Sequence, residues 1–293
     1  MEIENFSDQE KKKIVKEMKR EFLSDALKRK DDSNIPPVFW KNKWDNYKIE
    51  KEGNSPIPLD EEVVQSRKEA KYHCLMFSKN LEEIIKSHSG ASLLLVGKSG
   101  SGKSVLGTLI LKDVISILRE DVFYDTFSDF YLMASTANFV EHREILLNKY
   151  CSPEFLMIDE IESDPKVNNP KVQQYFHSII RHRAQYKKPT ILTTSVWNPK
   201  EFERIIGKST YREIRNSGVY LDSIKIKTQS EIKEKNPVEI SWGLKFDLDS
   251  LFIKINELRK DQNDKLKHSG TPGLIGGEML GKILNESISL GDK

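Results

Sequence analysis

Ser92-Leu93-Leu94-Leu95-Val96-Gly97-Lys98-Ser99-Gly100-Ser101-Gly102-Lys103-Ser104 is the stretch of this sequence that decides the fold. A short apolar run meets a glycine-rich loop, and a helical pattern follows from Lys103 to about Arg119. An apolar run of this length directly before a glycine loop is typical of a buried parallel strand. The segment from Gly97 to Ser104 fits G-x-x-x-x-G-K-[S/T] at every fixed position. The stretch therefore predicts a strand, a phosphate-binding loop and a helix.

The composition of this loop suits the chemistry of phosphate binding. Glycines allow backbone N–H groups to point inwards around phosphate oxygens, and the following helix presents its positive N-terminus to the same anion. Lys103 is expected to reach the β- and γ-phosphates, and Ser104 to give its hydroxyl to Mg²⁺. We therefore expect ATP to bind here with magnesium. The residues expected to contact the nucleotide are Gly97, Lys98, Ser99, Gly100, Ser101, Gly102, Lys103, Ser104 and Val105.

Strand and helix patterns alternate through the middle of the chain. Apolar runs at 122–124, 155–158 and 190–193 predict further strands, and helical patterns cover 60–89, a segment from about 129, and about 170–186. Alternation of this kind predicts an α/β fold of the P-loop NTPase type, in which helices cover both faces of a parallel sheet. Later segments at 220–226 and 244–248 are strand-like, and 249–266 has a helical pattern.

Two acids follow the apolar run Phe155-Leu156-Met157-Ile158. Asp159, at the carboxyl end of the predicted strand, is expected to orient Mg²⁺ through its waters, so that Ser104 and Asp159 form the metal site. Glu160 is expected to polarise the attacking water as a general base. The pair favours hydrolysis over binding alone. The alternative is a strand that happens to end in two solvated acids.

Polar residues later in the chain provide further candidates. Thr194 or Ser195, at the end of the strand at 190–193, is expected to hydrogen-bond the attacking water or the γ-phosphate, unless both only cap a turn. Arg212, with Arg215 close behind, is expected to stabilise charge on the transferring phosphoryl group of a neighbouring subunit. Solvated surface arginines are the alternative. A basic cluster is equally consistent with contacts to a nucleic-acid backbone and with complementing a helix dipole: Arg181, His182, Arg183, Lys187 and Lys188.

Composition excludes several classes of protein. The chain has 293 residues and a net charge of +2, with 47 Lys and Arg against 45 Asp and Glu, so bulk charge does not indicate a nucleic-acid binder. No apolar run approaches the roughly 20 residues that span a bilayer, and the N-terminus lacks the apolar core of a secretion signal. Two distant cysteines argue against a disulfide framework or a cysteine-rich zinc site. A cytoplasmic protein without a membrane contact is expected.

Four segments are expected along the chain. Residues 1–34 form an N-terminal helical extension, whose amphipathic pattern at 9–30 suits packing on its own domain or docking to a partner. Residues 35–222 form the ATPase core, 223–268 form its C-terminal part or a small subdomain, and 269–293 form a flexible Gly-rich tail. In the connector at 31–60, aromatic residues are expected to pin the chain to the core, with ligand contact as the alternative: Phe39, Trp40, Trp44 and Tyr47.

Taken together, these motifs resemble the DnaC/IstB group of AAA+ ATPases over about residues 35–220. Besides the phosphate loop and Ile158-Asp159-Glu160, the likeness is carried by Ile35-Pro36-Pro37-Val38-Phe39, Trp44-Asp45-Asn46-Tyr47, Asp125-Thr126-Phe127-Ser128-Asp129-Phe130, Phe176, Ile179, Ile180 and Arg181, and Pro189-Thr190-Ile191-Leu192-Thr193-Thr194-Ser195. The chain departs from the family at Ser195, where an asparagine is usual, and before Arg212, where it is one residue shorter. It also lacks a recognisable second sensor arginine and the cysteines of zinc-bearing loaders.

The resemblance implies ATP-controlled oligomerisation with an arginine supplied by the neighbouring subunit, and binding to single-stranded or duplex DNA. It implies delivery of a partner protein, either a ring helicase in DNA replication or a transposase. An ATPase that loads a helicase is therefore expected. The alternatives are a transposition ATPase that assembles on DNA and recruits a transposase, and a nucleotide-switched binding module with little hydrolysis. A small-molecule kinase is the weakest alternative, because Asp159-Glu160 suits the activation of water.

Overall fold

The computed structural model of this chain describes residues 24–49, 59–87, 89–162, 169–217 and 224–228, and the single residues 17, 21, 253, 256 and 257. All five ranges belong to one compact unit, residues 1–247, and the last three single residues belong to a second, residues 248–293. The strand expected at 244–248 and the tail lie outside the described residues. So does most of the helix expected at 249–266. Within the described residues, no helix has the length and apolarity that crossing a membrane requires.

A parallel sheet forms the centre of the first unit. Its five described strands follow the order β2-β3-β4-β1-β5, and every neighbouring pair is parallel. The strands are β1 (Leu93–Val96), β2 (Val122–Thr126), β3 (Phe155–Ile161), β4 (Thr190–Thr194) and β5 (Ile224–Lys225). Because all strands are parallel, the carboxyl ends of β1, β3 and β4 lie on the same side of the sheet. Open α/β sheets bind ligands at these carboxyl ends.

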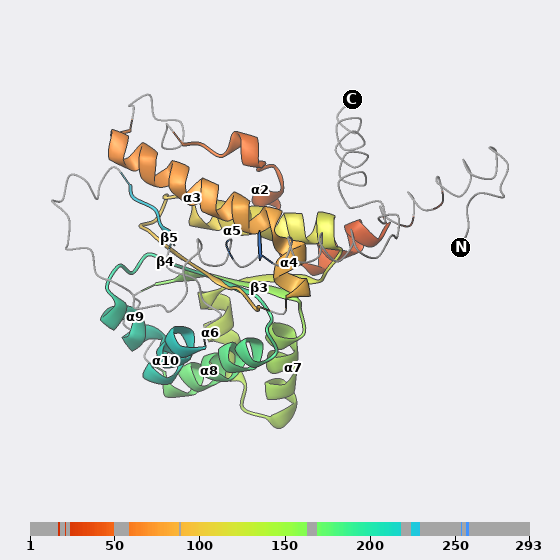
Figure 1. Ribbon diagram of the computed structural model, residues 1–293. Coiled ribbons are helices and arrows are strands. Elements are labelled where there is room, and N and C mark those ends of the chain that lie inside the picture. Colours follow the sequence, from red (N-terminus) through yellow and green to blue (C-terminus); the bar gives the residue numbers. More distant parts are fainter. Residues whose placement is uncertain are drawn as a thin grey trace. The chain divides into compact units, whose positions relative to one another are not determined.

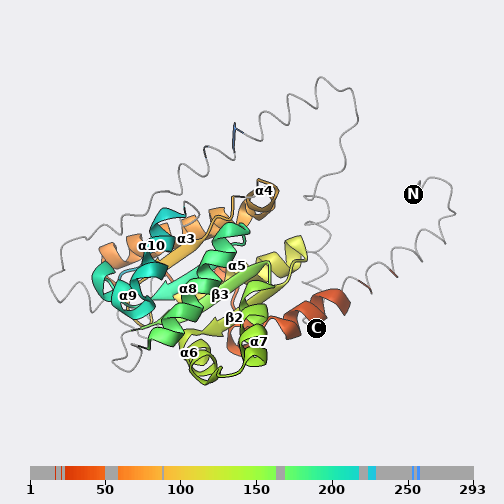
Figure 2. The same cartoon turned by 90° about the horizontal axis from the view of Figure 1, so that it is seen from below.

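Helices cover both faces of the sheet, which confirms the predicted fold class (Figure 1). One face carries α3 (Glu61–Lys79), α4 (Leu81–Lys86) and α5 (Lys103–Asp113). The other face carries α6 (Phe127–Thr136), α7 (Val140–Cys151), α8 (Pro170–Gln185), α9 (Pro199–Ile206) and α10 (Lys208–Asn216). Figure 2 shows the second face with α6, α7 and α8 lying over β2 and β3.

Besides the helical residues 24–32, three short elements complete the described unit. They are α2 (Pro37–Trp40), the 3₁₀ turn η2 (Trp44–Asn46) and the π-helical turn η3 (Val114–Leu118). The first two lie in the connector, and η3 continues α5 as far as Arg119, which ends it in the left-handed conformation with φ of 57°. The helix expected from Lys103 to about Arg119 therefore covers the right residues but widens in its last turn.

The core lies on both faces of the central strands. All side chains of β1 are fully buried, and each contributes about 1.5–3 kcal/mol relative to an exposed position. Under β2 and β3, Phe130 packs its ring 5.3 Å from both Tyr150 and Phe176, measured between centroids. On the α5 face, a Cβ at Gly107 would lie 2.6 Å from Cε of Met157, so the glycine lets α5 approach β3 closely. The helix after the phosphate loop is thereby held tightly on the sheet.

Local chemistry explains where the helices begin and end. Asn169 and Asn198 cap α8 and α9 by accepting from the backbone N–H of Lys171 and Lys200, and a proline follows each cap. The single helix expected at 60–89 is interrupted at Asn80, whose side chain donates to the carbonyl of Met76 at 2.6 Å. An asparagine that binds the backbone in this way competes with the helical pattern, so α3 ends and α4 begins there.

Candidate nucleotide-binding site

The predicted phosphate loop connects the carboxyl end of β1 to α5. Gly97 begins it by donating its N–H to the carbonyl of Thr194 at 3.0 Å, which fixes the loop to β4. Gly100 and Gly102 have φ of 81° and 99°, in the left-handed region that favours glycine. Gly102 is also the N-cap of α5. Ser104 and Val105, both half-buried, lie in the first turn of that helix, and Ser99 and Gly100 are exposed.

Tyr47 of the connector contacts the phosphate loop at Ser101 and Gly102. Its hydroxyl donates to the carbonyl of Ser101 at 3.3 Å, and a Cβ at Gly102 would lie 2.6 Å from the same hydroxyl oxygen. Burial raises the pKa of Tyr47 above its usual range, so the phenol stays a hydrogen-bond donor. Trp44 also pins the connector, since its indole N–H donates to Asp113 at 2.7 Å. These contacts confirm the expectation that aromatic residues hold the connector on the core.

The side chain of Lys103 lies inside the loop. Its ammonium group donates to the carbonyls of Gly97 at 2.5 Å and Lys98 at 3.0 Å, and the residue is only 6% exposed. A cation surrounded by a glycine-rich turn at a helix N-terminus is the arrangement that attracts phosphate oxygens. This charge, the loop and the Ser104 hydroxyl fit a magnesium–triphosphate ligand, because Mg²⁺ prefers oxygen ligands and usually shares them with phosphates.

The two predicted acids lie in a β-bulge. Ile158 pairs with Leu192 and Ile161 pairs with Thr194, so Asp159 and Glu160 together lie opposite the single residue Thr193. Glu160 has φ of 59°, which few residues other than glycine adopt. Asp159 is 1% exposed, whereas Glu160 is exposed. The bulge therefore gives two adjacent carboxylates different environments, which their different predicted roles require.

Two hydroxyl groups hold Asp159. Thr193 donates to its Oδ1, and Tyr124 in β2 donates to its Oδ2 at 2.8 Å. Thr193 also accepts the backbone N–H of Glu160 at 2.9 Å, so it bridges both residues of the bulge. A carboxylate oxygen accepts more than one hydrogen bond, so Asp159 keeps acceptor capacity for a metal-bound water. Neither Thr193 nor Tyr124 is among the site residues that the sequence predicts.

Charged groups of both the bulge and the phosphate loop affect the pKa of Glu160. Partial burial raises the pKa of Glu160, the negative charges of Asp159 and Glu162 raise it further, and the Lys103 ammonium lowers it. The influence of Lys103 means that the predicted base and the loop lysine share one local field. A glutamate whose pKa moves towards the working pH takes up a proton more readily, as a general base must.

Thr194 and Ser195 are placed differently from each other. The Thr194 hydroxyl donates to the carbonyl of Ile161 at 2.5 Å and accepts from the N–H of Val196 at 3.0 Å, and the residue is fully buried. Its hydroxyl is thus engaged within the sheet, and Thr193 is the hydroxyl beside the acids. Ser195 follows β4 and is half-buried. Its predicted contact with the nucleotide stays a prediction.

The predicted finger arginine lies on the surface. Arg212 is exposed on α10, as is Arg215, whose guanidinium lies 5.8 Å from the ring centroid of Tyr211. An arginine that acts on a neighbouring subunit has to be exposed, so these positions fit the predicted role without testing it.

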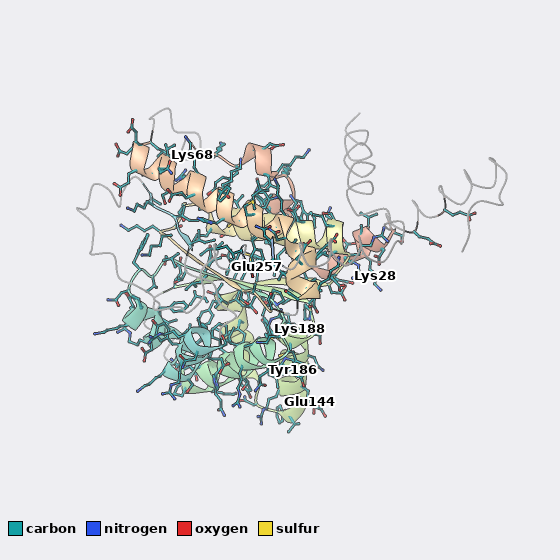
Figure 3. All side chains as sticks on the ribbon, viewed as in Figure 1. Lys28, Lys68, Glu144, Tyr186, Lys188 and Glu257 are labelled. Carbon is teal, nitrogen blue, oxygen red and sulfur yellow. The ribbon has the colours of Figure 1, made fainter. Side chains whose placement is uncertain are left out.

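The position of Arg183 contradicts the prediction that this member of the basic cluster contacts a nucleic-acid backbone. Arg183 is 1% exposed, and its guanidinium donates to the Thr190 hydroxyl and to the carbonyls of Tyr150, Pro153, Glu154 and Pro189. It therefore joins the starts of β3 and β4 and does not reach a nucleic-acid backbone. Figure 3 labels Tyr186 and Lys188, which follow α8, on the same side of the sheet as Glu144 of α7. Lys188 lies at the amino ends of β3 and β4, because it directly precedes Pro189 and Thr190 and its ammonium group is 4.0 Å from Glu154.

Comparison with known proteins gives distant structural likenesses. No protein-family model matches the chain, and no curated protein matches its sequence. The crystal structure of the DnaC helicase loader is similar at 17% identity and a TM-score of 0.45, over 70% of this chain and 99% of that one. DnaI is similar at 14% identity and 0.46, over 67% and 92%. The structure of AMPPCP-bound DnaA from Aquifex aeolicus is similar at 17% identity and a TM-score of 0.42. The match covers 61% of this chain and 49% of the DnaA chain.

Proposed function

We propose that this chain is an AAA+-type ATPase that assembles into oligomers, binds DNA and loads a replicative ring helicase. The observation that supports this most strongly is the meeting of two motifs at one edge of the sheet. The phosphate loop begins beside Thr194 of β4, and the bulged Asp159–Glu160 pair is held by Thr193 of the same strand. Strand β4 thus connects the proposed nucleotide-binding and water-activating groups.

The residues divide the work of hydrolysis as follows. Backbone N–H groups of the loop and the Lys103 ammonium hold the phosphates, and Ser104 and Asp159 are the protein groups that would hold Mg²⁺. The ion, when bound, neutralises charge on the phosphate oxygens. Glu160 takes the proton from the attacking water, which its exposed carboxylate at the bulge can approach. Arg212 of a neighbouring subunit stabilises the charge on the transferring phosphoryl group.

The coupling to DNA and to a helicase follows from the sequence resemblance. The helix expected at 9–30 would grip the helicase, and residues 24–30 of that region are helical in the structure. ATP between subunits would control assembly, so that the partner is held or released according to the nucleotide. In this proposal residues 1–34 serve the partner and residues 35–222 serve the nucleotide.

Hydrolysis assays on the full-length chain test the proposal. ATP turnover is measured alone, with single-stranded DNA and with duplex DNA, for the wild type, for Glu160→Gln and for Glu162→Gln as a matched control. We expect DNA to stimulate turnover in the wild type and the control, and Glu160→Gln to bind ATP without hydrolysing it. Nucleotide binding without any turnover in the wild type would instead identify a switched binding module.

A pull-down from the native host, with and without ATP, separates the remaining alternatives. Recovery of a hexameric helicase supports the loader. Recovery of a transposase, together with long filaments on duplex DNA, would contradict it and identify a transposition ATPase.

A further inference from the structure

The N-terminal connector reaches the acid cluster through one side chain, Tyr124. Residues 33–40, here termed the strap, contact β2, an outer strand of the described sheet, through Ser33, Asn34 and Phe39. The backbone N–H of Tyr124 donates to the carbonyl of Ser33 at 2.9 Å, and the side-chain amide of Asn34 donates to the carbonyl of Tyr124 at 2.9 Å. Both backbone polar groups of this tyrosine are therefore paired with the strap.

The strap is attached firmly at its other end. Lys112 of α5 donates to the carbonyls of Trp40 at 3.1 Å and Asn42 just beyond, and the Trp40 indole donates back to Ile35 at 3.1 Å. Residues before the strap are tied to the start of β2, since Arg29 pairs with Asp121. The strap thus runs from the end of α5, the helix of the phosphate loop, to the strand that carries Tyr124.

Tyr124 contacts both the strap and Asp159 of the candidate site. Its backbone is set by Ser33 and Asn34, its ring centroid lies 6.1 Å from that of Phe39, and its hydroxyl donates to Oδ2 of Asp159 at 2.8 Å. Burial raises the pKa of Tyr124 above its usual range, and the Asp159 carboxylate raises it further, so the phenol remains a donor. A cavity of about 640 Å³ is lined by residues of the strap, Tyr124 and Asp129, and Tyr124 itself is only 4% exposed.

We propose that Tyr124 is a positioning residue that orients the Asp159 carboxylate for Mg²⁺, and that the strap sets the position of Tyr124. This inference rests on the proposed ATPase function. It predicts that a substitution in the strap alters the Mg²⁺ dependence of nucleotide binding and leaves the structure of the phosphate loop unchanged.

The chain offers a closely matched control. Tyr150 also donates its hydroxyl to a buried aspartate, Asp125, at 2.7 Å, and burial together with that aspartate raises its pKa. Tyr150→Phe and Tyr124→Phe therefore lose the same type of hydrogen bond to the same type of partner. Only Tyr124 touches an acid of the proposed site, so a shared effect on thermal unfolding can be separated from an effect on metal.

The experiment measures how Mg²⁺ tightens the binding of a fluorescent ATP analogue, in the full-length chain, alongside ATP turnover. We expect Tyr124→Phe to raise the half-saturating Mg²⁺ concentration about tenfold, the lower end of what loss of a partner to a metal ligand usually causes. Affinity for the analogue without Mg²⁺ should stay unchanged, and Tyr150→Phe should behave as the wild type. Wild-type metal dependence in Tyr124→Phe would overturn the proposal.

A second variant addresses the strap. Asn34 has φ of 57°, so Asn34→Gly keeps a conformation that glycine adopts readily and removes only the side-chain donor. We expect a smaller shift in the same direction. If Asn34→Gly matches the wild type while Tyr124→Phe does not, the strap has no part in setting the ring and that half of the proposal fails.

The wild type separates this proposal from the ATPase assignment. A wild type that binds the analogue with Mg²⁺ but never turns ATP over would remove the hydrolytic function and leave the role of Tyr124 measurable by binding. A wild type that binds no nucleotide would overturn both.

Discussion

Thr193 of β4 donates its hydroxyl hydrogen to the carboxylate of Asp159 in β3. The bond forms at the bulge, where Asp159 and Glu160 lie opposite the single residue Thr193. The hydroxyl oxygen of Thr193 accepts the backbone N–H of Glu160 at 2.9 Å. One side chain therefore stabilises both the buried acid and the unusual backbone of the exposed one.

Removing that hydroxyl should disturb both acids. For Thr193→Val we expect ATP turnover to fall about 10- to 100-fold, as when a partner of a metal ligand is lost. Leaving the polar groups unpaired should lower the free energy of unfolding by about 1–3 kcal/mol. Thr194→Val is the matched control, because its hydroxyl also makes two bonds, but within the sheet. Similar losses of turnover in both variants would show that only folding is affected, whereas Thr193→Ser should restore turnover.

The raised pKa of Glu160 predicts the pH dependence of turnover. A general base acts in its ionised form, and a raised pKa means that this form is lost at a higher pH than for an ordinary glutamate, whose pKa is about 4.5. Measured kcat/KM should therefore fall on acidification with a midpoint above 4.5. Folding disfavours the ionised form, so Glu160→Gln should be more stable than the wild type at neutral pH, and the difference should vanish in acid. A stability difference that persists in acid would contradict this assignment.

Lys103 and Lys98 allow the loop to be tested with one type of substitution. Lys103→Ala removes the charge inside the loop, and a charge-assisted hydrogen bond contributes about 1.5–3 kcal/mol, so we expect ATP affinity to fall at least tenfold. Lys98→Ala keeps the backbone N–H at a variable position of the motif and should bind almost normally. Calorimetric titration with a non-hydrolysable triphosphate measures both. Unchanged affinity in Lys103→Ala would refute the proposed site.

Arg212→Ala should bind ATP normally and lose turnover, whereas Arg204→Ala, exposed on α9, should retain it. A finger supplied by a neighbour also predicts complementation. Mixing Arg212→Ala with Glu160→Gln creates interfaces that combine an intact base with an intact arginine, so turnover should recover in the mixture. Recovery on mixing distinguishes a shared site from one built within a single chain, which would stay inactive.

Arg183→Ala should destabilise the fold strongly. Its guanidinium donates to five oxygens around the starts of β3 and β4, and loss of a buried network of this kind should lower the free energy of unfolding by at least about 3 kcal/mol. Arg181→Ala, at an exposed position on the same helix, should change stability by less than about 0.5 kcal/mol. Urea denaturation followed by circular dichroism measures both, and equal stabilities would contradict the structural role.

Periodicity and turn chemistry were enough to predict the framework. The apolar runs at 92–96, 155–158 and 190–193 and the helix at 170–186 all appear within a few residues of their expected bounds. The helix α7 was missed, because its exposed first turns include Val140 and Ile145, which blur the amphipathic pattern. The break at Asn80 was missed because it depends on a side chain that bonds to the backbone.

The site was less predictable than the framework, because its details depend on register. The sequence predicts that Thr194 or Ser195 contacts the attacking water or the γ-phosphate, and this stays a prediction. A strand end with several hydroxyl groups does not show which of them also contacts the acids, and in the structure it is Thr193. The bulge at Asp159 and Glu160 decides this, and it is a pairing between β3 and β4 that no single segment encodes. Tyr124 was overlooked for the same reason, because its partner lies on a neighbouring strand 35 residues away.

The pairing of Ser33 with Tyr124 also has a consequence for solubility. Outer strands whose amides face water invite other chains to pair with them, and many proteins cover such edges. Here a stretch of the chain's own amino-terminal region occupies the exposed side of β2. A protein shortened to begin after residue 34 would uncover the backbone N–H and carbonyl of Tyr124, so the segment that contacts this tyrosine also guards against self-association.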